Sequence, residues 1–296
     1  MARKKTKEKK VKKTLKAAFV IILFLIFPLI SYSQGYLFII GGGNRSPEMM
    51  KKFIELAEKV KSGKIIIFPM ASSVPNEVGP EQAQEFRDIG AQSVEYHILT
   101  REQALKEENT SLLNDAGGVF FSGGDQSRLT DVLRDTPIHK KLLELYKEGA
   151  VIGGTSAGAA VMSEIMITGD EKRKEEEETS FSTIETDNIF TIPGFGFIKS
   201  AIIDQHFIAR KRHNRLLCLM AEHPLLLGIG IDESTAIIVD PAETFEVIGQ
   251  SNVIVYDASK AKIDILPSRI LSVHGMAMHI LKSGDRFDLK KHKVMK

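Results

Sequence analysis

The sequence predicts an α/β fold in which a parallel sheet carries helices on both faces. Between residues 36 and 167, strand-like and helix-like segments alternate five times, the pattern of a parallel sheet with crossover helices. The strand-like segments are continuously apolar, as expected of strands that are buried on both faces. Three of them run into glycine pairs or triplets, and ligands in such sheets bind beyond the carboxyl ends of the strands. We therefore expect the functional site at that edge.

Each unit of this alternation begins with a short apolar strand and continues into an amphipathic helix. The predicted strands cover residues 36–40, 64–70, 94–99, 118–122 and 150–152. The predicted helices cover residues 46–60, 80–89, 101–116, 126–147 and 156–167. Ser46 is the candidate N-cap of the first helix, with Pro47 in its first turn, and Pro137 interrupts the fourth helix.

The regular alternation of strand-like and helix-like segments ends after residue 170. Residues 170–178 (DEKRKEEEE) form a charge run that is typical of a solvated loop, and residues 190–197 are expected to form a shaped loop. Further strands are predicted at residues 201–207, 226–240 and 244–256, with a helix at 210–223 and a final pair of strands within 270–288.

The first 33 residues are predicted to be a secretory signal peptide. Residues 1–16 contain nine Lys or Arg, an uncharged apolar stretch follows at residues 17–30, and small residues stand at positions 31 and 33. The apolar stretch is shorter than the roughly 20 residues of a membrane span. An uncleaved anchor is the alternative, because the basic segment is long. Either interpretation places the remaining domain, residues 34–296, outside the cytoplasm, in a secreted or periplasmic location.

Charge and cysteine content exclude several kinds of partner. The chain has a net charge of +2, and residues 1–33 carry nine positive charges and one negative charge, a net of +8. The net charge of residues 34–296 is therefore about −6, and such an acidic domain lacks the basic surface that binds nucleic acid. The only cysteine, Cys218, lies in an apolar helical stretch, so no internal disulfide forms and a packing role is expected.

The strongest chemical signal is the segment 153–158 (GGTSAG), which follows a predicted strand and opens a helix. A G-x-S-x-G turn of this kind is a nucleophile elbow, and its serine here is Ser156. The helix N-terminus favours developing negative charge, and the backbone N–H of Ala157 is placed for an oxyanion. A phosphate-binding glycine turn is the alternative interpretation.

A serine nucleophile needs a base, and His206 is the preferred candidate among eight histidines. It ends the predicted strand 202–206, so it lies at the same edge of the sheet as Ser156. The alternative is the α/β-hydrolase order, with Ser156, Asp240 and His274. Two features oppose it: no antiparallel strands precede the parallel series, and His274 lies in a strand-like stretch.

Two further segments bring charged side chains towards the same edge. Arg210 begins a predicted helix on which Arg212 and Arg215 are i,i+3 neighbours, so the three could clamp a substrate carboxylate through forked hydrogen bonds. A solvated helix face is the alternative. Residues 228–235 (GIGIDEST) place Glu233 after a strand, where it could orient the imidazole, and turn capping is the alternative role.

Taken together, the chain resembles the cyanophycinases of peptidase family S51 over residues 36–260. Four motifs carry this resemblance: GGTSAGA at 153–159, SGGDQSRL at 122–129, IIDQHF-x2-R-x-R-x2-RL at 202–216 and GIGIDES at 228–234. The resemblance implies a flavodoxin-like α/β fold related to class I glutamine amidotransferases, a homodimer, and neither a metal nor an organic cofactor. It does not clearly cover the last 36 residues.

The resemblance also implies a reaction, the hydrolysis of cyanophycin to β-Asp-Arg dipeptides by a serine-type peptidase. Cyanophycin is a poly-aspartate with arginines on its side chains. An aspartyl or isoaspartyl dipeptidase of the same superfamily is the alternative activity, and a non-enzymatic binding protein on the same scaffold is a third.

Carried over residue by residue, Ser156 is the nucleophile, His206 the base and Glu233 the third member of the triad. Because related aspartyl dipeptidases take their acid soon after the serine, a carboxylate within residues 170–178 is the alternative acid. Gly124 joins Ala157 in the oxyanion hole. The positions that match substrate-binding residues are Gln126, Asp204, Gln205, Arg210, Arg212, Arg215 and Ser234.

Overall fold

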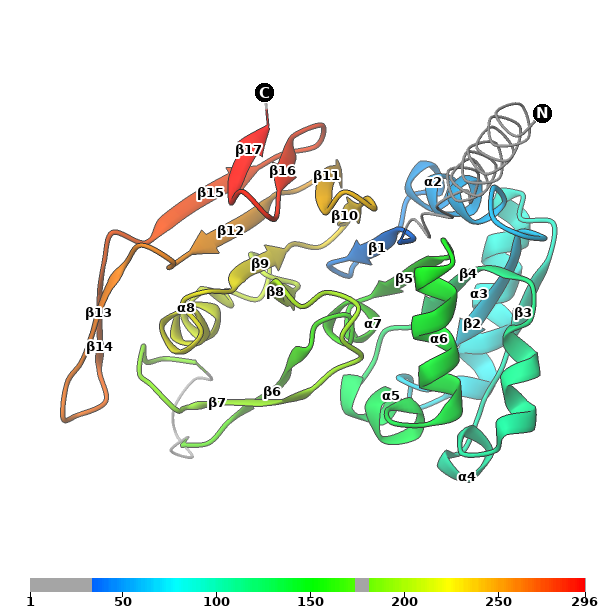
Figure 1. Cartoon of the computed structure of the whole chain (residues 1–296), viewed down its shortest axis with the longest axis horizontal. Coiled ribbons are helices and arrows are strands. Elements are labelled where there is room, and N and C mark those ends of the chain that lie inside the picture. Colours follow the sequence, from blue (N-terminus) through cyan, green and yellow to red (C-terminus); the bar gives the residue numbers. More distant parts are fainter. Residues whose placement is uncertain (1–33, 174–180, 296) are drawn as a thin grey trace, which may run out of the picture. The chain divides into compact units, whose positions relative to one another are not determined.

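The computed structural model describes residues 34–173 and 181–295 (Figure 1). The predicted signal peptide lies outside this range, as do residues 174–180, which include part of the charge run. Contacts divide the chain into residues 1–32 and 33–296, and the second unit contains all the described elements. Within the described residues, no helix has the length and apolar character needed to cross a membrane.

A nine-stranded sheet forms the centre of this unit. Five neighbouring strands are parallel, in the order β1-β5-β4-β2-β3, which confirms the predicted parallel sheet. They are Leu37–Ile40 (β1), Lys64–Phe68 (β2), Val94–Tyr96 (β3), Ala116–Phe121 (β4) and Val151–Thr155 (β5). Antiparallel strands continue the sheet beyond β1, namely Thr235–Val239 (β10), Thr244–Gly249 (β11), Arg286–Asp288 (β16) and Lys293–Met295 (β17).

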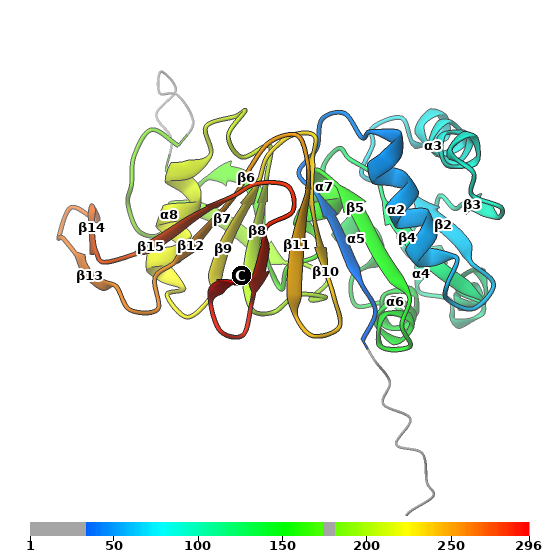
Figure 2. The ribbon, with the colours of Figure 1, turned by 90° about the horizontal axis from the view of Figure 1, so that it is seen from above.

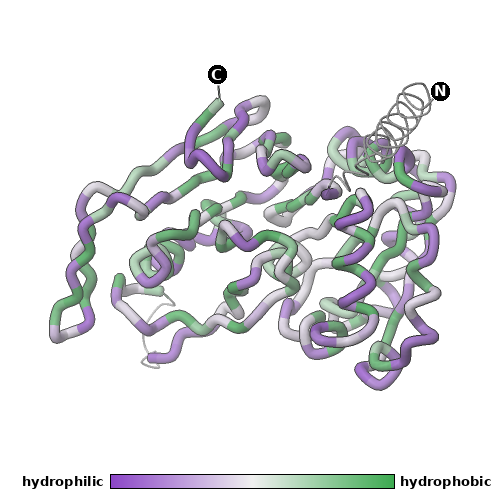
Figure 3. Tube along the Cα trace, viewed as in Figure 1, coloured by the Kyte–Doolittle hydropathy of each residue, from purple (hydrophilic) through white to green (hydrophobic). Residues whose placement is uncertain are grey.

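Helices cover both faces of the parallel part, as predicted (Figure 2). Because side chains alternate along a strand, Phe38 and Ile40 of β1 face one layer while Leu37 and Ile39 face the other. The first layer contains α2 (Pro47–Ala57) and α3 (Pro75–Ile89), and the second contains α5 (Gln126–Leu133) and α6 (Pro137–Lys147). The apolar strands therefore run through the interior of the unit (Figure 3).

Helix boundaries follow the capping residues. Ser46 accepts a hydrogen bond from the Met49 N–H and Pro47 begins α2, as predicted. Pro137 does not interrupt a helix but starts one, because Thr136 caps the N-terminus of α6. The predicted helix 80–89 begins five residues earlier, and the segment 101–116 contains only α4 (Arg101–Ala104) and a 3₁₀ helix, Glu107–Leu113 (η1).

The predicted helix 156–167 is largely wrong. Only Ala157–Ala160 (α7) is helical, and Ile165–Glu171 (β6) pairs with Ile189–Pro193 (β7), where a loop was expected. Residues 165–168 read IMIT, and branched side chains of this kind favour a strand where a partner strand is available. The paired residues are 18 to 28 positions further along the chain, so the local sequence does not indicate the pairing.

A second sheet of four strands carries the rest of the fold. Its strands are Ala201–Gln205 (β8), Leu227–Ile231 (β9), Val253–Asp257 (β12) and Ala277–Leu281 (β15), and Figure 1 shows His213–Glu222 (α8) beside them. A hairpin of Lys262–Ile265 (β13) and Leu271–His274 (β14) extends from it. The predicted strand 226–240 is thus two strands in different sheets, and the chain passes from one sheet to the other at residues 232–234.

Candidate active site

Ser156 occupies a strained bend between β5 and α7. Its backbone has φ 54° and ψ −108°, values that a residue with a side chain rarely adopts. Glycines make the bend possible, because a Cβ on Gly154 would lie 2.3 Å from the Gly158 carbonyl oxygen. The Ser156 N–H donates to the Ile40 carbonyl at 3.0 Å, which fixes the bend to the end of β1. This is the geometry of a nucleophile elbow.

The structure brings Ser156, His206 and Glu233 into a continuous chain of hydrogen bonds. The Oγ of Ser156 lies 2.8 Å from Nε2 of His206, and Nδ1 of His206 lies 2.6 Å from Oε1 of Glu233. In the described part of the chain, Asp240 and His274 take no part: Asp240 accepts the N–H groups of its own turn, and His274 bonds Ser272. The α/β-hydrolase order therefore has no structural support.

The charge state of His206 suits a general base. Burial lowers the pKa of His206 below its usual value, and the positive charges of Arg210 and Arg212 lower it further, while the hydrogen bond that His206 donates to Glu233 and the negative charge of Glu233 oppose them. The imidazole is therefore neutral at pH 7. A carboxylate can only accept a hydrogen bond, so Nδ1 carries the proton and Nε2 is free to accept the Ser156 hydroxyl.

The triple glycine after β1 shapes the space around the imidazole. The His206 N–H donates to the Gly41 carbonyl and the Ser234 N–H donates to the Gly42 carbonyl, each at 2.8 Å. A Cβ on Gly42 would lie 2.3 Å from Cε1 of His206. The glycine triplet marked this strand end in the sequence, but its contact with the histidine could not be inferred from spacing.

The predicted oxyanion donors lie at two backbone bends. Gly124 has φ +138°, and a Cβ on it would lie 2.1 Å from the Ala71 carbonyl oxygen. Gly123 packs beside Ser156, with its Cβ position 3.4 Å from the Ser156 Cβ. The N–H groups of Gly124 and Ala157 donate to no residue in the ranges 34–173 and 181–295. They are therefore available to a ligand.

The structure gives little support to an alternative acid within residues 170–178, of which residues 170–173 are described. Glu171 accepts the Phe181 N–H at 2.7 Å and the Asn188 side-chain amide at 3.2 Å, so it joins β6 to the segment that follows the charge run. Residues 174–178, which also belong to that prediction, lie outside the described residues.

Comparison with known proteins then identifies the family. Residues 37–247, more than half of the chain, match the family model described as "Peptidase family S51". The chain belongs to peptidase family S51. It is therefore a serine-type peptidase, as the sequence predicted.

The relatives of this S51 peptidase include several curated proteins named cyanophycinase. The one from Trichormus variabilis is 35% identical over 266 residues, with 87% of this chain and 86% of the relative covered. The one from Synechococcus elongatus is 33% identical over 272 residues, with 88% and 81% covered.

A solved structure supports the fold. The crystal structure of a peptidase from an acI-B1 Actinobacterium superposes with a TM-score of 0.64 at 24% identity, covering 87% of this chain and 98% of that one. The S51 peptidase thus has the flavodoxin-like α/β fold that the sequence predicted.

Two of the predicted substrate-binding residues are inaccessible in the S51 peptidase. Arg215 is 2% exposed and Asp204 is 1% exposed, and the guanidinium engages both carboxylate oxygens, with Nε 2.7 Å from Oδ2. The guanidinium carbon lies over the Phe181 ring, 5.1 Å from its centroid. A direct substrate contact by this pair does not fit these positions. The i,i+3 pattern could not reveal this burial, because the partner of Arg215 lies on β8.

Arg212 is partly exposed and contacts Gln205, which is itself buried. The Nη1 of Arg212 donates to both the carbonyl and the side-chain oxygen of Gln205 at 2.7 Å. Burial lowers the pKa of Arg212 to about 10, so the guanidinium stays charged at neutral pH. Arg212 precedes α8 rather than lying within it, which corrects the predicted helix start at residue 210.

Among the remaining predicted binding residues, Arg210 is the exposed one. Its backbone N–H donates to the His206 carbonyl at 2.9 Å, which places it one turn after the imidazole. Ser234 is partly exposed with φ 53°. Gln126 is buried, and its amide donates to the Ile167 and Thr168 carbonyls, so it anchors β6.

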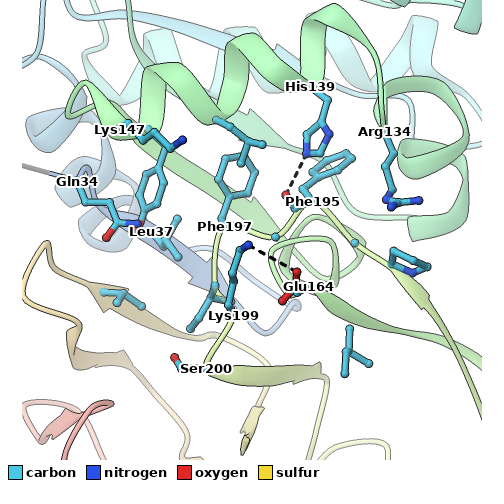
Figure 4. A pocket seen from close by; sticks show the side chains of 18 of the residues that line it. Gln34, Leu37, Arg134, His139, Lys147, Glu164, Phe195, Phe197, Lys199 and Ser200 are labelled. Atoms are coloured by element: carbon cyan, nitrogen blue, oxygen red, sulfur yellow. Dashed lines mark hydrogen bonds and ion pairs between the residues drawn. The ribbon is translucent and has the colours of Figure 1, made fainter. Parts of the chain in front are cut away.

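A large cavity lies at the other edge of the sheet from Ser156. Its volume is about 770 Å³, and it reaches Leu37, the first residue of β1 (Figure 4). His139 lines it, with Nε2 2.9 Å from the Phe195 carbonyl and Nδ1 accepting the Asp135 N–H. Both ring nitrogens are thus engaged, so His139 is no rival to His206 as a base.

Cys218 does not offer a second nucleophile. Cys218 is buried, and burial raises its pKa to about 11, which leaves an unreactive thiol in the predicted packing role. No group of three or more His, Cys, Asp or Glu in residues 34–173 and 181–295 is placed to hold a metal ion.

Proposed function

We propose that this S51 peptidase hydrolyses cyanophycin to β-Asp-Arg dipeptides with Ser156, His206 and Glu233 as its triad. The single observation that carries the proposal is the 2.8 Å contact between the Ser156 Oγ and the His206 Nε2 at a strained elbow. The substrate is taken from the relatives, since curated proteins named cyanophycinase are 33–35% identical over most of the chain.

In the proposed first half-reaction, His206 takes the proton of Ser156 while Oγ attacks the backbone carbonyl carbon of an aspartyl residue, so the side-chain amide to arginine stays intact. The oxyanion that forms accepts hydrogen bonds from the N–H groups of Gly124 and Ala157. Glu233 stabilises the imidazolium and holds its orientation. His206 then gives its Nε2 proton to the leaving backbone nitrogen, the C–N bond breaks, and an acyl-enzyme remains on Ser156.

In the second half-reaction, His206 takes a proton from water, and the resulting hydroxide attacks the acyl carbon. Collapse of the second tetrahedral intermediate breaks the ester bond, and His206 returns the proton to the Ser156 oxygen. The released product carries a new carboxyl group. In this proposal the exposed Arg210 is the cation best placed to attract a substrate carboxylate, because its guanidinium is close enough to His206 to lower the histidine pKa.

The experiment is incubation of purified residues 34–296 with cyanophycin, with products identified by liquid chromatography and mass spectrometry. We expect β-Asp-Arg from the wild-type protein and none from Ser156→Ala, which should keep its thermal stability. Cleavage of short isoaspartyl peptides but not of the polymer would assign the protein to the dipeptidases instead. Product formation by Ser156→Ala at the wild-type rate would reject the triad.

We also propose that residues 1–33 act as a signal peptide and that the mature protein is a secreted or periplasmic homodimer. The basic, apolar and small-residue segments in that order support secretion. Mass spectrometry of protein from the culture medium or periplasm should find Gln34 at the N-terminus. Light scattering of the mature protein should give twice the monomer mass.

A further inference from the structure

Asp232 is a buried carboxylate directly beside the proposed triad that the triad does not itself use. It is 7% exposed and immediately precedes Glu233, at the point where the chain leaves β9. From the sequence, turn capping was one possible role for this acidic pair. The structure shows a more specific arrangement for Asp232, because its hydrogen-bond partners belong to other segments.

The carboxylate of Asp232 joins three parts of the chain. Its Oδ1 accepts the backbone N–H of Ile208 at 3.0 Å and that of Ala209 at 2.9 Å, both in the turn that follows His206. Its Oδ2 accepts the hydroxyl of Ser251 at 2.7 Å, from the segment between β11 and β12. These hydrogen bonds outweigh the cost of burial and lower the pKa of Asp232, so it is ionised at neutral pH.

The turn that Asp232 holds is one that needs support. His206 has φ 49°, in the left-handed region that is uncommon for residues other than glycine. The chain reverses directly after it, since the Arg210 N–H donates to the His206 carbonyl and the Arg212 N–H to the Phe207 carbonyl. Asp232 ties this reversal to its own segment of the chain, in which the next residue, Glu233, is the hydrogen-bond partner of the imidazole.

We propose that Asp232 is a positioning residue, which clamps the turn after His206 to the segment that carries Glu233 and so keeps the imidazole between Ser156 and Glu233. The proposal rests on the triad proposed above. Asp232 makes no contact with the reacting atoms. Its effect is therefore on the alignment of His206, and a misalignment of about 1 Å can lower a rate by about 100-fold.

The test uses two variants of the mature protein, residues 34–296. Asp232→Ala removes every acceptor, whereas Asp232→Asn keeps an oxygen for the two N–H groups and can donate its amide to the Ser251 oxygen. We expect kcat on cyanophycin to fall by about 100-fold in Asp232→Ala with KM little changed, and Asp232→Asn to recover most of it. The rate of Ser156 labelling by a fluorophosphonate should follow kcat, and this rate needs no knowledge of the substrate.

Asp240→Ala is the matched control. Like Asp232, Asp240 accepts two backbone N–H groups in a turn, those of Ala242 at 2.9 Å and Thr244 at 3.0 Å, but that turn joins β10 to β11. We expect it to lower thermal stability while leaving the labelling rate unchanged. Equal losses of labelling in Asp232→Ala and Asp240→Ala would overturn the proposal, because any lost turn contact would then be enough.

Two other results would also overturn it. One is wild-type labelling in Asp232→Ala, and the other is an Asp232→Asn variant as slow as Asp232→Ala, which would make the charge rather than the hydrogen bonds responsible.

If Asp232→Ala does not fold, Ser251→Ala carries the test, since it removes the Oδ2 partner and should slow labelling while Asp240→Ala does not. A fully active Ser156→Ala variant would reject the triad, whereas an inactive Ser156→Ala with a fully active Asp232→Ala rejects the positioning role alone.

Discussion

Nδ1 of His206 and Oε1 of Glu233 lie 2.6 Å apart, although 27 residues separate them along the chain. The pairing of β8 with β9 explains this contact. The two strands are parallel neighbours with Gln205 opposite Ile231, so the residues that follow each strand emerge at the same edge. The crossover through α8 takes up the intervening sequence, and the change of sheet after Ile231 turns Glu233 towards the imidazole.

We predict that Glu233→Gln lowers kcat by about 10⁴-fold, because an amide can donate to Nδ1 and so favour the wrong tautomer of His206. The measurement is steady-state hydrolysis of cyanophycin together with fluorophosphonate labelling of Ser156. Glu171→Gln is the control, since Glu171 bonds Phe181 and Asn188 instead of the histidine. A larger loss in Glu171→Gln than in Glu233→Gln would make Glu171, at the end of β6, the acid of the triad.

The sequence was sufficient for the features that depend on strand ends. Apolar runs followed by glycines located β1, β4 and β5, and the same reasoning placed Ser156 and His206 at one edge. It failed where a partner is distant in sequence. The pairing of β6 with β7 and the second sheet both depend on contacts between segments far apart in the chain, so local periodicity does not reveal them.

Charged side chains were the other source of error. The spacing of Arg210, Arg212 and Arg215 is the same whether a helix face is solvated or buried, and only the position of Asp204 on β8 decides between them. The structure separates the three by depth: Arg210 is exposed, Arg212 is partly buried and Arg215 is enclosed. The sequence therefore indicated a cationic segment at the site but not which of its members can reach a ligand.

The pH dependence of kcat/KM should reveal how the positive charge of Arg210 affects the pKa of His206. Because His206 must be neutral to act as a base and its pKa is below its usual value, kcat/KM should hold down to mildly acidic pH and fall as His206 becomes protonated. Removing the positive charge in Arg210→Gln raises the pKa of His206, so the acidic limb of the kcat/KM profile should move to higher pH. Added salt should move the wild-type limb in the same direction by screening Arg210.

Lys211→Gln is the control for that shift. Lys211 is an exposed neighbouring cation, whereas the pKa of His206 responds mainly to burial, Glu233, Arg210 and Arg212. Its profile should superpose on that of the wild type. An acidic limb that stays in place or moves to lower pH in Arg210→Gln would contradict the proposed charge environment of His206.

We predict that Gly42→Ala slows the enzyme by displacing His206. The new methyl group would lie 2.3 Å from Cε1, so the ring must move, and labelling of Ser156 should slow by about 100-fold. Gly90→Ala separates this clash from backbone strain: Gly90 has φ +118°, close to the +111° of Gly42, but a Cβ there meets nothing within 4 Å. Comparable slowing in both variants would show that strain alone is responsible.

The buried pair of Arg215 and Asp204 should contribute to stability rather than to substrate contact. Replacing Arg215 by Met leaves the Asp204 carboxylate, which is 1% exposed, without its main partner, and such uncompensated charges cost about 3–5 kcal/mol. The control is Arg45→Met. Arg45 also makes a two-pronged contact, with Glu85, but the side chains are 20% and 30% exposed, so its loss should cost less than about 1 kcal/mol. Urea unfolding of both variants decides the matter: if Arg215→Met keeps wild-type stability but loses affinity for cyanophycin, Arg215 binds substrate after all.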